Sequence, residues 1–310
     1  MKAYRGLCLR RQLVRYYSCT SRQQKHNNIL QSAEHQLRLV GVPDAANSSK
    51  LLWEAANGNL NQFNQFIQRR QEREPLQYIV GNWDFHDITL LVRSPVLIPR
   101  PETEELVEYV LKTILLLPGS RKKRILDIGT GTGAIGLALL KADLNDSIEF
   151  CTAIDCDERA YRLATENAAN LGLSNRFHCI HTDIRNFHPE HEYDLIVSNP
   201  PYIPSGDIDT LQPEVLLYET RTALDGGGQN GDSIPKFILG RAFELLKSDG
   251  ELFLELHHTH TEDVVRSWLE NVADHPHPPI MQYVESKRDF AGIQRFHRLR
   301  CHNKDTRVYI

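Results

Sequence analysis

The chain has 310 residues and a formal net charge of −4, and 41% of its residues are hydrophobic and 25% charged. This length allows two domains and a large core, and the composition is that of an ordinary soluble protein. No apolar run approaches the roughly 20 residues that a membrane helix needs, which excludes a membrane-spanning protein. We expect a monomer without membrane contacts.

The first 17 residues differ from the rest of the chain in charge. Five basic residues alternate there with leucine, valine and tyrosine, and no acidic residue precedes Glu34. Such a start is typical of a mitochondrial transit peptide, so we expect cleavage after Tyr17 and a location in the mitochondrial matrix. A basic tail for nucleic acid is the alternative. Cleavage would leave 31 basic and 40 acidic residues, a net charge of about −9, which is unfavourable for binding a phosphate backbone.

Cysteine and histidine spacing gives no sign of a metal site. The six cysteines form no CxxC pair and should be free thiols in a reducing or neutral compartment. They are Cys8, Cys19, Cys151, Cys156, Cys179 and Cys301. The histidines at 257, 258 and 260 cluster without carboxylates or cysteines at ligand spacing, so we expect a loop after a strand and no metal.

Residues 18–75 are predicted to form a small helical domain. Apolar residues recur there every three to four positions in three segments, centred near Leu37, Leu52 and Phe63. Residues 76–103 have strand composition from Tyr78 onward, with turn residues between the apolar runs. We expect this segment to be a β-hairpin that links two domains, followed by a helix that begins near Thr103.

Residues 104–310 are predicted to form the second domain. From residue 124 onward strands and helices alternate, which indicates a parallel sheet with helices on both faces. The connection between the last two strands is too short for a crossover helix, so these two should be antiparallel. Expected strands are 124–128, 148–155, 177–181, 193–198, 250–256, 282–285 and 294–300. Expected helices are 134–141, 158–171, 233–246 and 261–271. The fold class is therefore α/β, with a seven-stranded, mostly parallel Rossmann-like sheet.

A glycine-rich turn, Gly129-Thr130-Gly131-Thr132-Gly133, follows the first of these strands. Glycines let the backbone approach a ligand closely and adopt positive φ. Together with Gly136 the turn also matches the GxGxxG spacing of dinucleotide-binding proteins, so a nicotinamide or flavin enzyme remains an alternative. No lysine of the P-loop kind follows the glycines, which argues against a triphosphate.

Two aspartates follow the next two strands at the same edge of the sheet. Asp155, at the end of the second strand, can accept hydrogen bonds from both hydroxyls of a ribose. Asp183, after the third strand, can accept from an exocyclic adenine amine. Together with the glycine turn they predict an adenosine pocket, and the turn could cradle a pyrophosphate or an amino-acid tail.

The fourth strand ends in Ser198-Asn199-Pro200-Pro201-Tyr202. Consecutive prolines terminate a buried strand, which leaves Asn199 at the carboxyl end of the sheet, where open α/β sheets bind ligands. The Asn199 carboxamide offers one acceptor and two donors, a match for another amide or for an amino group on a purine. Tyr202 adds a flat face with a polar tip.

With these residues assembled, the chain resembles the class I S-adenosylmethionine-dependent methyltransferases. It resembles in particular the HemK-type (PrmC-like) family, which methylates the side-chain nitrogen (N5) of the glutamine in the Gly-Gly-Gln motif of peptide-chain release factors. The stretches that carry the likeness are residues 74–81, 97–104, 127–133, 167–173, 198–202 and 288–292. The chain departs from the family pattern at Leu256-His257, where a glycine is usual, at Thr220, where a proline is usual, and in a longer loop at 225–232.

This resemblance implies a role for each part of the site. S-adenosyl-L-methionine would contact the turn and strand ends, and Asn199 and the Pro200 carbonyl would accept the two hydrogens of the substrate amide. Tyr202 would pack against that amide, with the helical domain docking a mitochondrial class I release factor. The implied cofactor residues are Asp127, Gly129, Thr130, Gly131, Thr132, Gly133, Asp155, Asp183, Ile184 and Asn199. The implied substrate residues are Phe85, Arg100, Thr103, Asn199, Pro200, Pro201 and Tyr202.

Two further functions compete with this one. An adenine-N6 methyltransferase acting on DNA or RNA would face the same pair of hydrogens on an aromatic amine, but it needs a basic surface. A catalytically idle methyltransferase-like module that binds a ribosomal partner would not need both the glycine turn and Asn199.

Overall fold

The computed structural model describes residues 24–116, 121–272 and 281–302, and the predicted transit peptide lies outside them. The chain divides into two compact units, and the boundary lies between Val80 and Gly81. Within the described residues, no helix is both long and apolar enough to cross a membrane. The four cysteines in this part of the chain, 151, 156, 179 and 301, are all free thiols, as expected.

The first unit is helical, as predicted. A helix over residues 24–39 precedes α2 (Ala45–Ala55), α3 (Leu60–Gln71) and the short α4 (Leu76–Val80). Leu37, Leu52 and Phe63, one from each predicted apolar segment, are fully buried in its core. The α3 helix begins where the Asn59 side chain accepts hydrogen bonds from two backbone N–H groups of the first turn, which is the capping expected of asparagine at this position.

The strand expected from Tyr78 to Val80 is wrong, because these residues are the helix α4. The Pro75 carbonyl accepts hydrogen bonds from the N–H groups of Tyr78 and Ile79 and so starts a helical turn. Ile79 is then buried against the core of the helical unit. Burial against the other helices outweighs the strand propensity of the sequence Tyr-Ile-Val, which is a weak and context-dependent preference.

The hairpin itself is present but shorter than expected, with β1 (Asn82–Phe85) antiparallel to β2 (Ile88–Leu91). His86 begins its two-residue turn with a positive φ of 51°. The hairpin lies in the second unit, where Phe85, Ile88 and Leu90 are buried in the main core. It is therefore part of the α/β unit, and the boundary between the units lies a few residues after the expected one.

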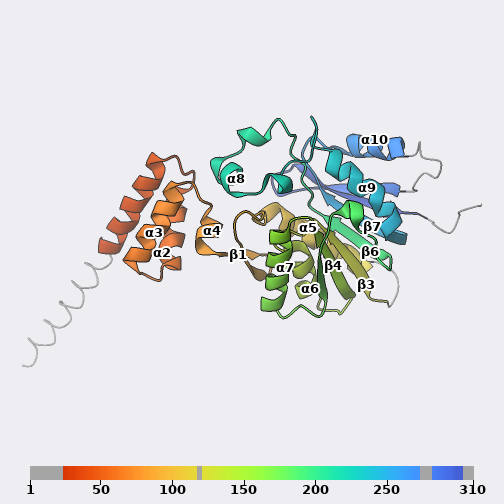
Figure 1. Ribbon diagram of the computed structural model, residues 1–310, viewed down its shortest axis with the longest axis horizontal. Coiled ribbons are helices and arrows are strands. Elements are labelled where there is room, and N and C mark those ends of the chain that lie inside the picture. Colours follow the sequence, from red (N-terminus) through yellow and green to blue (C-terminus); the bar gives the residue numbers. More distant parts are fainter. Residues whose placement is uncertain (1–23, 117–120, 273–280, 303–310) are drawn as a thin grey trace, which may run out of the picture. The chain divides into compact units, whose positions relative to one another are not determined.

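The second unit is built on a seven-stranded sheet in the order β5-β4-β3-β6-β7-β9-β8 (Figure 1). Neighbouring strands are parallel except that β9 is antiparallel to both β7 and β8, which confirms the prediction for the end of the chain. The strands are β3 (Lys123–Ile128), β4 (Ile148–Asp155), β5 (Phe177–His181), β6 (Tyr193–Ser198), β7 (Leu246–Glu255), β8 (Met281–Arg288) and β9 (Gln294–Cys301).

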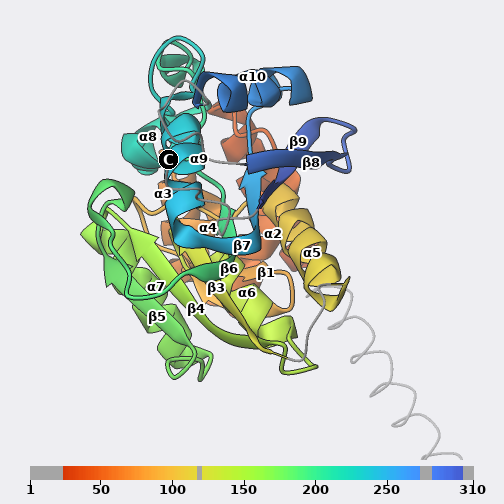
Figure 2. The same ribbon diagram turned by 90° about the vertical axis from the view of Figure 1, so that its right-hand side faces the viewer.

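Helices cover both faces of the sheet, as the alternation of elements predicts (Figure 2). One hydrophobic core joins the sheet to α5 (Pro101–Leu116), α6 (Ala134–Ala142) and α7 (Glu158–Asn170). The opposite core joins it to α9 (Ser233–Leu245) and α10 (Glu262–Val272). Most parallel strands are buried on both faces, which explains their continuous apolar runs.

Two parts of this unit differ from the sequence expectation. The strand β7 begins at Leu246, four residues early, because Leu246 pairs with Tyr193 before an irregularity in the register. Asp249 has a positive φ of 61° within this stretch. The segment between β6 and α9 contains the unpredicted α8 (Pro213–Tyr218) and two single turns, Ile208–Thr210 and Arg221–Ala223.

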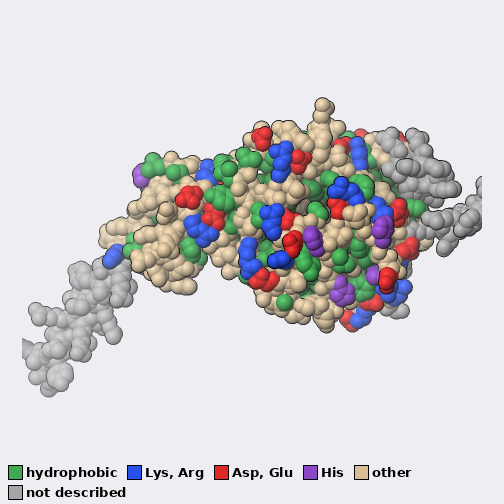
Figure 3. Space-filling view, viewed as in Figure 1, with side chains coloured by type: hydrophobic (Ala, Val, Ile, Leu, Met, Phe, Trp, Pro, Cys, Tyr) green, Lys and Arg blue, Asp and Glu red, His purple; other side chains and the backbone are tan. Residues whose placement is uncertain are grey.

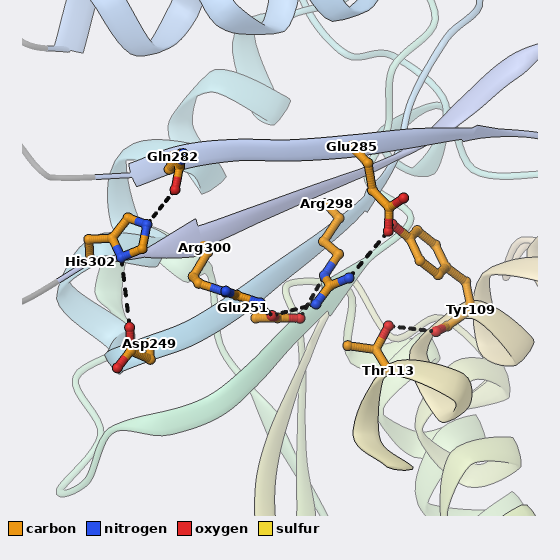
Figure 4. A network of polar contacts seen from close by, with 9 residues as sticks. All are labelled: Tyr109, Thr113, Asp249, Glu251, Gln282, Glu285, Arg298, Arg300 and His302. Atoms are coloured by element: carbon orange, nitrogen blue, oxygen red, sulfur yellow. Dashed lines mark hydrogen bonds and ion pairs between the residues drawn. The ribbon is translucent and has the colours of Figure 1, made fainter. Parts of the chain in front are cut away.

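A charged cluster lies within the antiparallel part of the sheet (Figure 4). Glu251 on β7 has no solvent exposure, and its carboxylate accepts hydrogen bonds from Arg298 and Arg300 on β9 at 2.6 to 3.0 Å. Arg298 also reaches Glu285 on β8, which accepts from the Tyr109 hydroxyl of α5. The cluster therefore ties three strands and a helix together through one buried carboxylate.

We expect Glu251→Ala to lower the free energy of unfolding of this unit by about 3 kcal/mol, because it leaves two arginines near the core without their main partner. Urea denaturation measures this change. The control is Glu262→Ala, which removes an exposed i,i+4 pair with Arg266 on α10 and should cost about 0.5 kcal/mol or less. Equal losses for the two variants would show that the buried cluster does not stabilise the sheet.

Candidate functional site

The carboxyl ends of β3, β4 and β6 open into a cavity of about 630 Å³. The central strand β3 pairs with β4 on one side and with β6 on the other, so the direction of strand succession reverses there. This reversal is the position at which open α/β sheets bind ligands. The predicted site residues that line the cavity are Gly129, Gly131, Asp155, Asp183, Ile184, Asn199, Pro200 and Pro201.

The glycine turn forms the floor of the cavity. Gly129 and Gly131 have φ of 71° and 57°, and an added Cβ at either would point into open space. Positive φ therefore selects glycine here, because packing does not. The N–H of Gly131 donates to Asp155 Oδ2 at 2.9 Å, and the N–H of Gly129 donates to the Ile154 carbonyl. These bonds fix the turn against β4.

Asp127, predicted to contact the cofactor, lies beneath the turn and does not line the cavity. It has no solvent exposure, and its Oδ2 accepts from the Thr130 hydroxyl at 2.7 Å and from the Gly136 N–H at 3.2 Å. Burial raises its pKa to about 6. Thr132 is buried as well, and its carbonyl accepts from Asn167 of α7. Asp127 therefore supports the turn from below, while Thr130, Thr132 and Gly133 belong to the turn but do not line the cavity. Direct contact of these four residues with a cofactor stays a prediction.

The two predicted adenosine aspartates both reach the cavity. Burial raises the pKa of Asp155, whose Oδ1 also accepts from the Asp157 N–H. Asp183 begins the short turn Ile184–Asn186 and pairs with Arg185, whose guanidinium lowers the pKa of that carboxyl. The cavity thus has one mostly buried carboxylate near the glycine turn and one ionised carboxylate nearer its rim.

Asn199 is held from one side by a buried hydroxyl. Its Nδ2 donates to Thr103 Oγ1 at 3.1 Å, and Thr103 in turn donates to Glu255 Oε2 at 2.8 Å. Tyr202 donates from its hydroxyl to the other oxygen of Glu255 at 3.2 Å. Pro200 is buried beside Asn199 and lines the cavity. The structure therefore brings Thr103 together with Asn199, although the two residues are 96 positions apart in the sequence.

Glu255 is a site residue that the sequence prediction missed. It is 1% exposed at the end of β7, and burial raises its pKa to about 7. The available signal was a carboxylate that ends the apolar run Leu252-Phe253-Leu254 at the same edge of the sheet as Asn199. Such a group must be hydrogen-bonded to be tolerated at this depth.

Four of the predicted substrate residues do not line the cavity: Phe85, Arg100, Thr103 and Tyr202. Phe85 is 1% exposed and belongs to the main core, and its predicted place at the border of the site stays a prediction. Arg100 is partly exposed and forms an ion pair with the buried Glu219 at 2.6 Å. The residue after Glu219 is Thr220, which lines the cavity, so this ion pair lies near the site.

The long segment between β6 and α9 closes the other side of the cavity, and no motif predicted it. Thr220, one departure from the family pattern, donates its N–H to the Pro95 carbonyl at 2.8 Å, a bond that a proline could not make. A Cβ on Gly226 would lie 2.7 Å from the Tyr202 Cα, and one on Gly231 would collide with the Tyr202 carbonyl. These two glycines let the 225–232 loop pack directly on the backbone beside Asn199.

Comparison with known proteins adds two matches to family models. Residues 108–231 match the Methyltransferase small domain, and residues 56–81 match the PrmC N-terminal domain. A solved structure of a ribosomal protein L11 methylase from Lactobacillus delbrueckii subsp. bulgaricus aligns with a TM-score of 0.46 at 16% identity, over 67% of this chain and 82% of that one.

Curated relatives align over most of the chain. The human MTRF1L release factor glutamine methyltransferase is 42% identical over 75% of this chain and 69% of its own length. The release factor glutamine methyltransferase of Caulobacter vibrioides is 34% identical over 75% of this chain and 84% of its own length. The release factor glutamine methyltransferase of Thermosynechococcus vestitus is 40% identical over 74% of this chain and 75% of its own length.

Proposed function

Because the chain belongs to the family of release factor glutamine methyltransferases, we propose that it methylates the N5 nitrogen of the glutamine in the Gly-Gly-Gln motif of a mitochondrial release factor. The methyl donor is S-adenosyl-L-methionine. The observation that supports this substrate most is the position of Asn199, whose carboxamide stands at the edge of the cavity that begins at the glycine turn. An amide group there matches the shape and hydrogen-bonding pattern of a glutamine side chain.

The cavity residues fit S-adenosyl-L-methionine. A volume of about 630 Å³ suits a ligand of this size. Asp155 and Asp183 offer acceptors for ribose hydroxyls and an adenine amine, and the open Cβ positions of Gly129 and Gly131 leave room for close contact with the backbone. When bound, S-adenosyl-L-methionine supplies an electrophilic methyl group. Asp127 would act on it only through the turn that it supports.

The chain's own residues address the weakness of the nucleophile. A carboxamide nitrogen shares its lone pair with its carbonyl, and no side chain of ordinary pKa deprotonates it in advance. In the proposed mechanism Asn199 Oδ1 and the Pro200 carbonyl accept its two N–H groups and orient the nitrogen. Such orientation can supply roughly 7–11 kcal/mol of the barrier. Acceptors that face charge developing on the nitrogen add electrostatic stabilisation, and the proton leaves late to water.

The surface near the cavity favours a protein substrate over a nucleic acid. Arginines beside the cavity are already paired with acids, as in Arg185 with Asp183, Arg221 with Asp225 and Arg100 with Glu219. On the face in Figure 3, Lys and Arg side chains lie among Asp and Glu side chains. Binding a phosphate backbone needs basic groups that are not neutralised in this way.

We also propose where the protein is located, which part of it binds the release factor, and its oligomeric state. The basic, acid-free residues 1–17 support import into the mitochondrial matrix. The helical unit, part of which matches the PrmC N-terminal domain, would dock the release factor. We expect a monomer that forms no stable complex with nucleic acid.

One assay tests the function directly. The purified protein is incubated with radiolabelled S-adenosyl-L-methionine and a mitochondrial release factor, and with the same factor carrying Gln→Ala in its Gly-Gly-Gln motif. We expect label in the first factor and none in the second. Equal labelling of both factors, or labelling of an adenine-containing DNA or RNA instead, would refute the proposed substrate.

We expect Asp155→Ala to weaken the binding of S-adenosyl-L-methionine by tenfold or more, because it removes the ribose acceptor and a bond to the Gly131 N–H together. Isothermal titration calorimetry measures the dissociation constant. The control is Asp146→Ala, which removes a solvent-exposed acid on the loop between α6 and β4 and should leave that constant unchanged. An unchanged constant for Asp155→Ala would remove this residue from the cofactor site.

Asn199→Ala should keep the fold and lower kcat by about 10² or more, because a preorganised polar contact to the reacting nitrogen is lost. Steady-state kinetics with the release factor and circular dichroism measure the two quantities. Asn170→Ala, at an exposed position at the end of α7, is the matched control and should behave as the wild type. Turnover near the wild-type value in Asn199→Ala would exclude this side chain from the mechanism.

A further inference from the structure

Glu255 connects the two side chains that are proposed to face the substrate amide. Its two carboxylate oxygens each accept one side-chain hydrogen bond, from Thr103 at 2.8 Å and from Tyr202 at 3.2 Å. Thr103 is 4% exposed and Glu255 1% exposed, so both groups are removed from water. These contacts join the start of α5, the end of β7 and the segment after β6 at one point.

The hydrogen bonds among Asn199, Thr103, Tyr202 and Glu255 all donate toward the Glu255 carboxylate. An ionised carboxylate only accepts, so the single hydroxyl hydrogen of Thr103 is directed to Glu255. Thr103 Oγ1 can then only accept, and the group that donates to it at 3.1 Å is Asn199 Nδ2. The amino end of the Asn199 carboxamide is therefore fixed toward Thr103, and its oxygen is directed away from Thr103.

We propose that Glu255 is a positioning residue that, through Thr103, sets which end of the Asn199 carboxamide faces the substrate. This inference rests on the proposed function, since it requires an acceptor toward the glutamine N–H groups. With the carboxylate in place, Asn199 presents its oxygen. With a donor at position 255, Thr103 can donate to the Asn199 oxygen, and the carboxamide turns its amino end to the substrate. Two donors would then oppose each other.

The charges around Glu255 make this arrangement sensitive to pH. Arg295 on β9 lowers the pKa of Glu255, as do the hydrogen bonds from Thr103 and Tyr202, while Glu102 on α5 raises it. Burial is the largest effect and raises this pKa to about 7. Arg295 is itself held by Asp289 at 2.8 Å. Because the raised pKa means that Glu255 becomes protonated as the pH falls through about 7, we expect the correct carboxamide orientation above that pH and its loss below.

The kinetic test uses Glu255→Gln, which preserves the shape of the side chain but adds a donor. We expect kcat for release factor methylation at pH 8 to fall about 10²-fold, the dissociation constant of S-adenosyl-L-methionine to stay within about twofold, and the acidic limb of the pH profile near 7 to disappear. The matched control is Glu251→Gln, the same change four residues earlier on β7 in the charged cluster of Figure 4. It should lower stability and keep the acidic limb.

A double-variant cycle separates positioning from a general structural loss. Thr103→Val removes the connecting hydroxyl, so it should lower kcat about as much as Glu255→Gln. The double variant should be no slower than either single variant, because both break the same chain of hydrogen bonds. Effects that multiply, or an acidic limb that survives in Glu255→Gln, would overturn the inference. If the wild-type protein methylates the factor and Glu255→Gln methylates it equally well, the role of Glu255 is refuted. The proposed function is left intact in that case.

Neutron diffraction tests the same inference without relying on methyl transfer. In crystals of the full-length protein kept above pH 8, the deuterium between Thr103 and Glu255 should be bonded to the Thr103 oxygen. The Asn199 amino group should face Thr103. Density that places a deuterium on Glu255, or the Asn199 oxygen toward Thr103, would contradict the proposed direction even if the substrate were a different molecule.

Discussion

The parallel pairing of β3 with β6 is the constraint on which the rest of the site depends. Its register places Ile128 opposite Ser198, and the Ser198 hydroxyl donates to the Ile128 carbonyl at 2.7 Å. The next residues along the two strands are Gly129, which begins the glycine turn, and Asn199. The cavity at the glycine turn and the Asn199 carboxamide are therefore neighbours, because two adjacent strands end side by side. A shift of one residue would turn every side chain of β6 to the opposite face of the sheet.

Buried polar groups then give this edge of the sheet a defined geometry. Asp127 supports the glycine turn from below, and Asn167 connects the turn to the β1–β2 hairpin by bonding both Thr132 and Leu91. Glu255 accepts hydrogen bonds from Tyr202 and from Thr103, and Thr103 in turn holds Asn199. Each of these side chains is costly to bury without partners, so the bonds that satisfy them also restrict where the neighbouring site residues can lie. In this account the residues behind the site determine its chemistry as much as the residues that face it.

Much of this arrangement could be predicted from the sequence because it follows from local rules. Apolar runs that end in glycines, aspartates or prolines predicted the sheet, the cavity edge and the placement of Asp155, Asp183 and Asn199. Local rules failed where long-range packing decides. They assigned Tyr78 to a strand, although contacts within the helical unit make it helical. Glu255 was missed because its partners are 152 and 53 residues away in the sequence.

The central claim is that a methyl donor and a glutamine amide meet at Asn199. A crystal structure with S-adenosylhomocysteine and a peptide containing Gly-Gly-Gln tests it most directly. The account predicts the nucleoside between the glycine turn and Asp155, and the glutamine nitrogen about 3 Å from Asn199 Oδ1, with the sulfur facing that nitrogen. A nucleoside bound elsewhere, or a glutamine side chain that does not contact Asn199, would contradict it.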